Sequence, residues 1–213
     1  MELEDYESQI VADNETQWTQ WIGIPGFDPF PAIRCRTGSL RSEHPPVEPD
    51  GSVGLEMWLH DRDGVAGGAI AEVYLGGEES GGRQIRFPGA HSSEVAGLFQ
   101  RAVAPGMVGL DVTDVLWVLP KAGGLGRVTE YPIPTVRSHT NEMEARLTAQ
   151  LMEYGEPYSA LVVLPVDQSV TPDTLDLVAS SMKRYLSSEA RFVLSAPLSE
   201  TDGERLRVCL FWP

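Results

Sequence analysis

Two stretches, VGLEMWLHD (residues 53–61) and AIAEVYLGG (residues 69–77), decide the fold expected for this chain. In the first, Leu55, Met57 and Leu59 alternate with Glu56 and other polar or aromatic residues, and the second stretch alternates in the same way. A period of two predicts a strand with one buried face. The short segment between the stretches contains Asp-Gly and Gly-Gly, which are typical of a hairpin turn. We therefore expect two antiparallel strands here.

The residues between these strands raise a second question, because WLHDRDG (residues 58–64) contains a histidine, two aspartates and an arginine. Aspartate side chains accept hydrogen bonds from nearby backbone amides, and glycine supplies the positive φ that turns need. The four histidines of the chain form no HExxH or HxH pair, and the segment lacks the further oxygen ligands of a calcium loop. Asp61, Arg62 and Asp63 are therefore predicted to form the tip of the hairpin, with no metal bound.

The rest of the chain indicates further strands and a few helices. Residues 1–16 are polar and acidic and are predicted to be an N-terminal arm, followed by one β-rich globular domain over residues 17–213. Helical spacing and capping residues predict helices in the segments 91–103, 141–155 and 171–187. The apolar, β-branched segment 107–120 is predicted to be one or two strands, and the segment 191–212 a second hairpin.

The number of strands and their hairpin-like connections decide the fold class. We expect an α+β domain that is predominantly antiparallel β, sandwich- or barrel-like, with two or three short helices. The helix–strand–helix–strand segment over residues 141–197 is the one part that resembles a βαβ unit, and it keeps an α/β fold open as the alternative.

The net negative charge of the chain argues against some classes of binding partner. The chain of 213 residues has 31 acidic and 16 basic residues, a formal net charge of −15. Such a surface repels phosphate backbones and anionic lipid, so we expect no nucleic-acid partner. No apolar run approaches the length of a membrane span, and the acidic N-terminus differs from a signal peptide, so no membrane insertion is expected. Cys35 and Cys209 are predicted to be buried thiols, although a pair between them is left open.

No motif in the chain predicts catalysis. The glycines of AGGLGR (residues 122–127) open no predicted helix and match no phosphate-binding loop. Ser195 lies in a predicted strand without the strand–turn–helix context of a nucleophile elbow. We therefore expect no enzyme, no catalytic residue, no cofactor and no metal.

The opening DYESQIVADNETQWTQWIG, the stretch FPAIRCRTGSL and the hairpin after it carry a resemblance to a known family. They are similar to the spike, or projection, domain of avian-type astrovirus capsid proteins. The resemblance implies a β-rich, dimeric, non-enzymatic capsid domain on the virion surface that attaches to a host-cell receptor and is bound by antibodies. Receptor contacts would come from exposed loops, with Asp61, Arg62, Asp63 and the loop 39–51 as candidates.

A homodimer is also expected from the residues themselves, with an interface in the segments poorest in acidic residues, which are 21–27, 107–110 and 116–127. The alternative function belongs to a different class. It is a cytoplasmic bacterial or phage α/β enzyme or accessory protein with a cleft beside the 141–197 segment.

Overall fold

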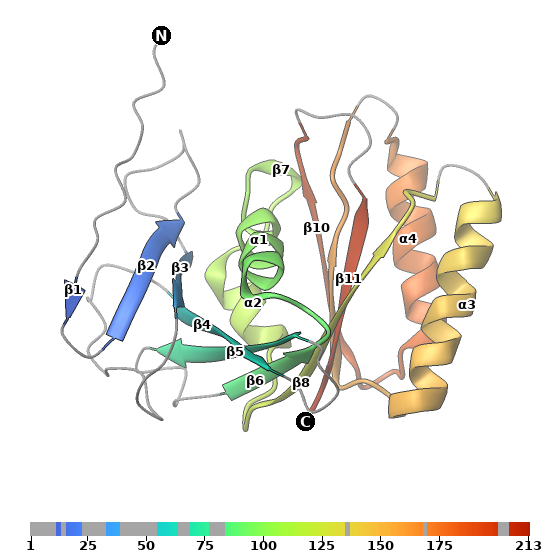
Figure 1. Cartoon of the computed structure of the whole chain (residues 1–213). Helices are drawn as coiled ribbons and strands as arrows, with labels where there is room; N and C mark the ends of the chain where they lie inside the picture. The colour runs from blue at the N-terminus through green and yellow to red at the C-terminus, as the bar shows by residue number, and fades with distance from the viewer. Residues whose placement is uncertain are drawn as a thin grey trace, which may run out of the picture. The chain divides into compact units, whose positions relative to one another are not determined.

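The computed structural model describes residues 12–13, 16–22, 33–38, 55–63, 69–76, 84–134, 137–167, 170–199 and 205–213. Contacts divide the chain into two compact units, unit 1 (Met1–Gln100) and unit 2 (Arg101–Pro213). Figure 1 shows their helices and strands, and each unit is described by itself. The single domain over residues 17–213 stays a prediction, and most of the predicted arm over 1–16 lies outside the described residues.

Unit 1 contains a sheet of six strands in the order of the chain. They are β1 (Ala12–Asp13), β2 (Thr16–Ile22), β3 (Ile33–Gly38), β4 (Leu55–Asp63), β5 (Ala69–Gly76) and β6 (Gln84–Pro88). Neighbouring strands are antiparallel, except that β3 and β4 are parallel. The β4–β5 pair extends from Glu56↔Gly76 to Asp63↔Ala69, which confirms the predicted hairpin.

The alternation that predicted these strands also forms the core of unit 1. Met57, Leu59, Val73, Ile85 and Phe87 are fully buried on one face of β4, β5 and β6. The predicted helix after them is α1 (Ser92–Ala102). Its Phe99 meets Phe87 edge to face, with ring centroids 6.4 Å apart. Aromatic pairs of this geometry are stabilising beyond the area that they bury, so this contact fixes α1 on β6.

Unit 2 has a five-stranded sheet in which chain order and spatial order differ. Along the chain come β7 (Gly106–Val108), α2 (Val112–Val118), β8 (Gly124–Tyr131), α3 (Arg137–Tyr154), β9 (Ser159–Val163), α4 (Pro172–Tyr185), β10 (Arg191–Pro197) and β11 (Leu206–Trp212). In space the strands follow the order β8-β11-β9-β10-β7. Only the β9–β10 pair is parallel.

Helices cover both faces of this sheet (Figure 1). On one face α3 and α4 enclose a core with alternate residues of β9 and β11; Met143, Leu147, Val178 and Met182 are among its buried members. On the other face α2 contacts β9 and β10. β9 lies between these layers with all five residues buried, as expected for a strand that is apolar on both faces.

Helix ends were predicted with mixed success, because α3 begins at Arg137, four residues before the predicted start at Asn141. Thr171 caps α4, with its Oγ1 accepting from the backbone N–H of Thr174 at 3.4 Å, and Pro172 occupies the first helical position as predicted. Gly155 has φ +79° directly after α3, and its N–H donates to the carbonyl of Leu151. Glycine reaches this left-handed region without strain, so the predicted helix end is confirmed.

Two predicted strand assignments are wrong. Part of the segment 107–120 is the helix α2, because Asp111 and Asp114 form a reciprocal capping box that starts a helix despite the β-branched residues that follow. The predicted second hairpin also fails, since β10 and β11 are not paired with each other. The apolar β9 lies between them and pairs with both.

The expected fold class, a predominantly antiparallel sandwich or barrel with two or three short helices, is also wrong. Within each unit the strands pair in a mixed pattern that includes one parallel pair. The described residues include four helices, and α3 alone has 18 residues. The physical reason is that a strand buried on both faces requires cover on both sides, which α2 supplies on one side and α3 and α4 on the other. Unit 2 is therefore an α/β arrangement.

Candidate functional site

An open groove of about 550 Å³ lies in unit 2, where β8 meets α3. Arg146, Ala149, Gln150 and Glu153 line it from α3, at a spacing that places them along one side of the helix. β8 lines the groove with four consecutive residues, 127–130, and Arg205 completes it just before β11. The groove is therefore formed by three segments that are distant in the sequence.

Arg127 is the most constrained cation of the groove. Its Nη1 donates a short hydrogen bond to the Tyr154 hydroxyl and lies 3.8 Å from Glu153 Oε1. Its guanidinium carbon lies 5.1 Å from the centre of the Tyr154 ring, a cation–π distance. Hydrogen bonding to Glu153 raises the pKa of Tyr154, and the charge of Arg127 partly offsets this. Arg127 is thus held in place by α3.

The other two arginines are less constrained. Arg146 is paired with Glu142 one turn earlier on α3, with Nη2 and Oε1 at 2.7 Å, and its side chain is half exposed. Arg205 is exposed and makes no hydrogen bond or ion pair with any residue that the structure describes. Both guanidinium groups therefore retain donors that a bound molecule can use.

Two of the groove-lining residues are joined by a hydrogen bond. Gln150 Nε2 donates to Thr129 Oγ1 at 2.5 Å. Next to this pair is Tyr131, whose ring is fully buried and whose hydroxyl has no hydrogen-bond partner among the described residues. Burial raises the pKa of Tyr131 to about 12, while the positive charges of Arg146 and Arg127 act in the opposite direction. The phenol is therefore neutral at physiological pH and lies close to the groove-lining residues.

Charge is distributed unequally between the two units. Unit 1 has 6 basic and 17 acidic residues, whereas unit 2 has 10 basic and 14 acidic residues. Three of the ten basic residues line the groove, against two glutamates. Of the two glutamates, Glu130 is already paired with Arg207, whose Nε lies 2.9 Å from Glu130 Oε1. In a chain of net charge −15, the groove is a local concentration of guanidinium groups.

Guanidinium groups limit what the groove can do chemically. They stay charged at all relevant pH values, and their planar donors match the geometry of carboxylate and phosphate groups. The amide of Gln150 and the hydroxyl of Thr129 add neutral donors and acceptors beside them. The arrangement therefore suits recognition of an anionic group.

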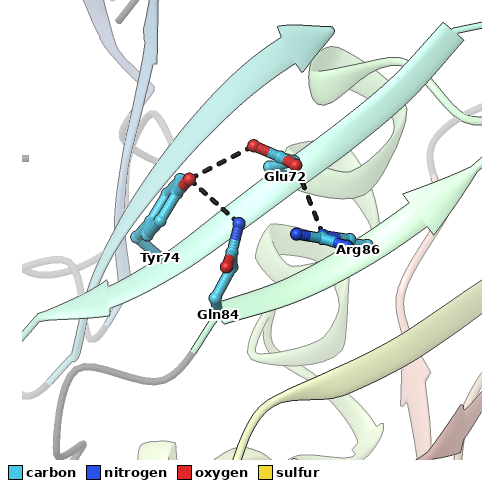
Figure 2. Close-up of polar contacts among 4 residues, drawn as sticks. All are labelled: Glu72, Tyr74, Gln84 and Arg86. Atoms are coloured by element: carbon cyan, nitrogen blue, oxygen red, sulfur yellow. Dashed lines mark hydrogen bonds and ion pairs between the residues drawn. The ribbon is translucent and has the colours of Figure 1, made fainter. Parts of the chain in front are cut away.

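A second polar cluster lies on β5 and β6 of unit 1 (Figure 2). Glu72 is only 3% exposed, and its Oε1 lies 3.4 Å from Nε of Arg86, its register partner on β6. The Tyr74 hydroxyl donates to Glu72 at 3.2 Å and accepts from Gln84 Nε2 at 3.0 Å. These four residues satisfy one another across two strands, as expected for a structural network on a sheet.

The predicted site residues lie elsewhere. Asp61, Arg62 and Asp63 are part of β4, before the turn that was expected to contain them. Asp61 accepts two hydrogen bonds from Ser92 at the start of α1. The side chains of Arg62 and Asp63 and the loop 39–51 lie outside the described residues, so a receptor-binding role stays a prediction. Among the described residues, no three His, Cys, Asp or Glu side chains gather as metal ligands would.

The predicted burial of Cys209 is confirmed. The thiol is free and fully buried, and burial raises its pKa well above the ordinary value. The side chain of Cys35 lies outside the described residues.

Few features of the sequence indicated the groove. No motif connects Arg127, Arg146 and Arg205, which are distant from one another in the sequence. The one available signal was the cleft expected beside the 141–197 segment, and the groove does lie on α3, the first helix of that segment.

Comparisons with known proteins complete the description. No protein-family model and no curated protein matches the chain. Among solved structures it is similar to an FtsZ mutant from M. jannaschii, with a TM-score of 0.44 and 20% identity over 56% of this chain and 36% of that one. It is also similar to an empty FtsZ dimer from M. jannaschii, with a TM-score of 0.41 and 18% identity over 57% of this chain and 39% of that one. A likeness of this degree assigns no activity.

The chain thus spans well under half of the FtsZ chains that it resembles. Neither of these structures is a viral projection domain, and the spike interpretation stays a prediction without support from these comparisons. None of the helices in the described part of the chain is both long and apolar enough to cross a membrane.

Proposed function

We propose that this chain is an α/β accessory protein that binds a small anionic ligand, with carboxylate or phosphate groups, in the groove between β8 and α3. The observation that carries the proposal is the convergence of Arg127, Arg146 and Arg205 from three separate segments of an otherwise acidic chain. In this proposal the chain binds its ligand without turning it over, in line with the expectation that it is not an enzyme.

Each arginine has a distinct role in the proposed complex. Arg127, which Tyr154 and Glu153 hold in place, supplies a fixed positive charge at one end. Arg146 and Arg205 supply the donors that pair with the anion, and Arg146 exchanges its exposed pair with Glu142 for the ligand. An exposed ion pair contributes little to stability, so this exchange costs little.

Binding is tested by titrating the protein with inorganic phosphate and, separately, with citrate, while NMR follows the arginine side-chain N–H signals. Arg146→Gln combined with Arg205→Gln is expected to weaken binding at least about tenfold, because each charge-assisted hydrogen bond is worth about 1.5–3 kcal/mol. The two titrations show which of the two anionic groups the groove prefers.

The matched control is Lys121→Gln combined with Lys183→Gln. It removes the same charge from two exposed positions that do not line the groove. This control should change affinity less than about twofold, because distant exposed charges are screened. Equal losses in both double variants, or no binding of either anion, would contradict the proposal. Turnover of a phosphate ester that depends on the groove arginines would replace the binding role with a catalytic one.

A further inference from the structure

Large exposed apolar side chains in the described residues gather at one edge of unit 2. β7 is the last strand of its sheet and pairs there only with β10, through Ala196↔Val108 and Pro197↔Gly106. Met107 is 51% exposed and Val108 37%, and Leu198, whose N–H donates to the Pro105 carbonyl, is 60% exposed. These three residues are a majority of the five large hydrophobic side chains that are exposed in the described part of the chain. The edge is therefore an apolar surface that no described element covers.

The sequence around β7 is also free of charge. Residues 102–110 contain no ionisable side chain, although the chain as a whole carries −15. The uncharged segment is flanked by Arg101 on its N-terminal side and by Asp111 on its C-terminal side. Residues 102–110 themselves present no carboxylate to a second copy of the same acidic chain, whereas most other surfaces would repel it.

We propose that β7 is the centre of a homodimer interface, in which two copies pair their β7 strands antiparallel about a two-fold axis. Antiparallel pairing centred on Met107 brings Met107 of one copy opposite Met107 of the other and Val108 opposite Gly106, and an edge strand supplies unpaired backbone groups for this contact. The contact is self-complementary, as a two-fold interface requires.

This interface coincides with one of the three acid-poor segments expected to mediate dimerisation, residues 107–110. Residues 116–127, another of these segments, include Trp117, which is 48% exposed and stacks with Arg191 at 5.4 Å. Trp117 is therefore already engaged within its own chain. Residues 23–27 of the remaining segment lie outside the described residues.

Sedimentation velocity over a range of about 1 to 100 µM protein tests the proposal. The wild-type chain is expected to form a dimer within this range, and to dissociate more readily at about 50 mM than at about 500 mM salt, because salt screens the repulsion between two copies. Met107→Glu should weaken the dimer at least tenfold, since it places a carboxylate beside its own copy across the axis.

The matched control is Met152→Glu, an equal substitution at an 85% exposed methionine on α3. It should change the dimer constant less than about twofold. As a second measurement, Met107→Cys should give a disulfide-linked dimer on mild oxidation, and Met152→Cys should not. A wild-type chain that stays monomeric at 100 µM would leave the edge to another partner and overturn the proposal. A dimer that Met107→Glu does not weaken would also overturn it, by placing the interface on another surface.

Discussion

Asp61 holds the first residue of α1 through both of its carboxylate oxygens. Oδ1 accepts from the Ser92 backbone N–H at 2.6 Å, and Oδ2 accepts from the Ser92 hydroxyl at 2.9 Å. The two residues are 31 positions apart in the sequence, so a β4 side chain satisfies a helix start that local residues would otherwise cap. The residue that was predicted to form a hairpin tip or a receptor contact therefore joins the sheet to the helix.

We expect Asp61→Ala to lower the free energy of unfolding by roughly 1–2 kcal/mol, because a helix N–H and a hydroxyl lose their acceptor. Ser92→Ala should cost about 1 kcal/mol, and the double variant less than the sum of the two. Urea unfolding of the two single variants and the double variant measures the coupling. Glu156→Ala, at an exposed position after α3, is the control and should stay within about 0.5 kcal/mol of the wild type. Fully additive losses would show that the two residues do not interact.

Two pairs of directly opposed glutamate and arginine residues offer a matched comparison. Glu72–Arg86 joins β5 to β6 around a buried carboxylate, whereas in Glu130–Arg207, which joins β8 to β11, the glutamate side chain is 47% exposed. Glu72→Ala should cost roughly 1–3 kcal/mol, because the Tyr74 hydroxyl and the partly covered Arg86 lose their acceptor.

In the exposed pair, Glu130→Ala should cost no more than about 1 kcal/mol, because water screens the charges. Thermal unfolding of both variants, at low and high salt, measures the difference. The stability cost of Glu130→Ala should approach zero as the salt concentration increases, because salt screens the exposed ion pair. Equal costs would indicate that burial does not decide the strength of these cross-strand pairs.

The buried phenol of Tyr131 predicts how stability depends on alkaline pH. Its pKa is about 12 in the folded chain, against an ordinary value of about 10, so the folded state keeps a proton that the unfolded state loses. Stability from this group is therefore complete below pH 10 and decreases as pH rises from 10 to 12. A displacement of about two units corresponds to at most about 3 kcal/mol.

Tyr131→Phe should remove this part of the alkaline decrease. At neutral pH the variant should be about as stable as the wild type, because the hydroxyl that it removes has no hydrogen-bond partner among the described residues. Cys209 contributes a further decrease, because its pKa is also raised by burial, and this should persist in the variant. Denaturant unfolding between pH 7 and pH 12 checks the difference. Identical pH profiles would contradict the assignment to Tyr131.

Gly106 is required for β7 to lie beside β10. A Cβ atom at this position would lie 2.0 Å from the Ala196 carbonyl oxygen, so Gly106→Ala must displace one of the two strands. We expect a loss of about 1–3 kcal/mol and faster hydrogen exchange in β7. Gly109→Ala is the control, because nothing lies within 4 Å of a Cβ atom there. Slow exchange retained in β7 of Gly106→Ala would show that the backbone relaxes at little cost.

The sequence by itself determined the features that depend on neighbouring residues. The alternation in 53–61 and 69–77 was sufficient for the β4–β5 hairpin, because pairing across one turn needs no distant partner. Thr171 with Pro172, and Gly155 after α3, marked helix ends for the same reason, since a cap satisfies backbone groups within one turn. Asp111 and Asp114 also form a local capping signal, which the strand prediction over 107–120 did not take into account.

The position of β9 and the contacts between distant residues depend on the tertiary structure alone. β9 lies between β10 and β11 because an apolar strand without a polar face is most stable where two strands and two helical layers exclude water from it. The burial of Glu72, the contact of Asp61 with Ser92 and the convergence of Arg127, Arg146 and Arg205 each join residues that are not neighbours in the chain. Such contacts form only once sheets and helices have packed, because their energies depend on which distant groups the fold brings within a few ångströms. No periodic pattern in the sequence predicts which of these distant groups come into contact.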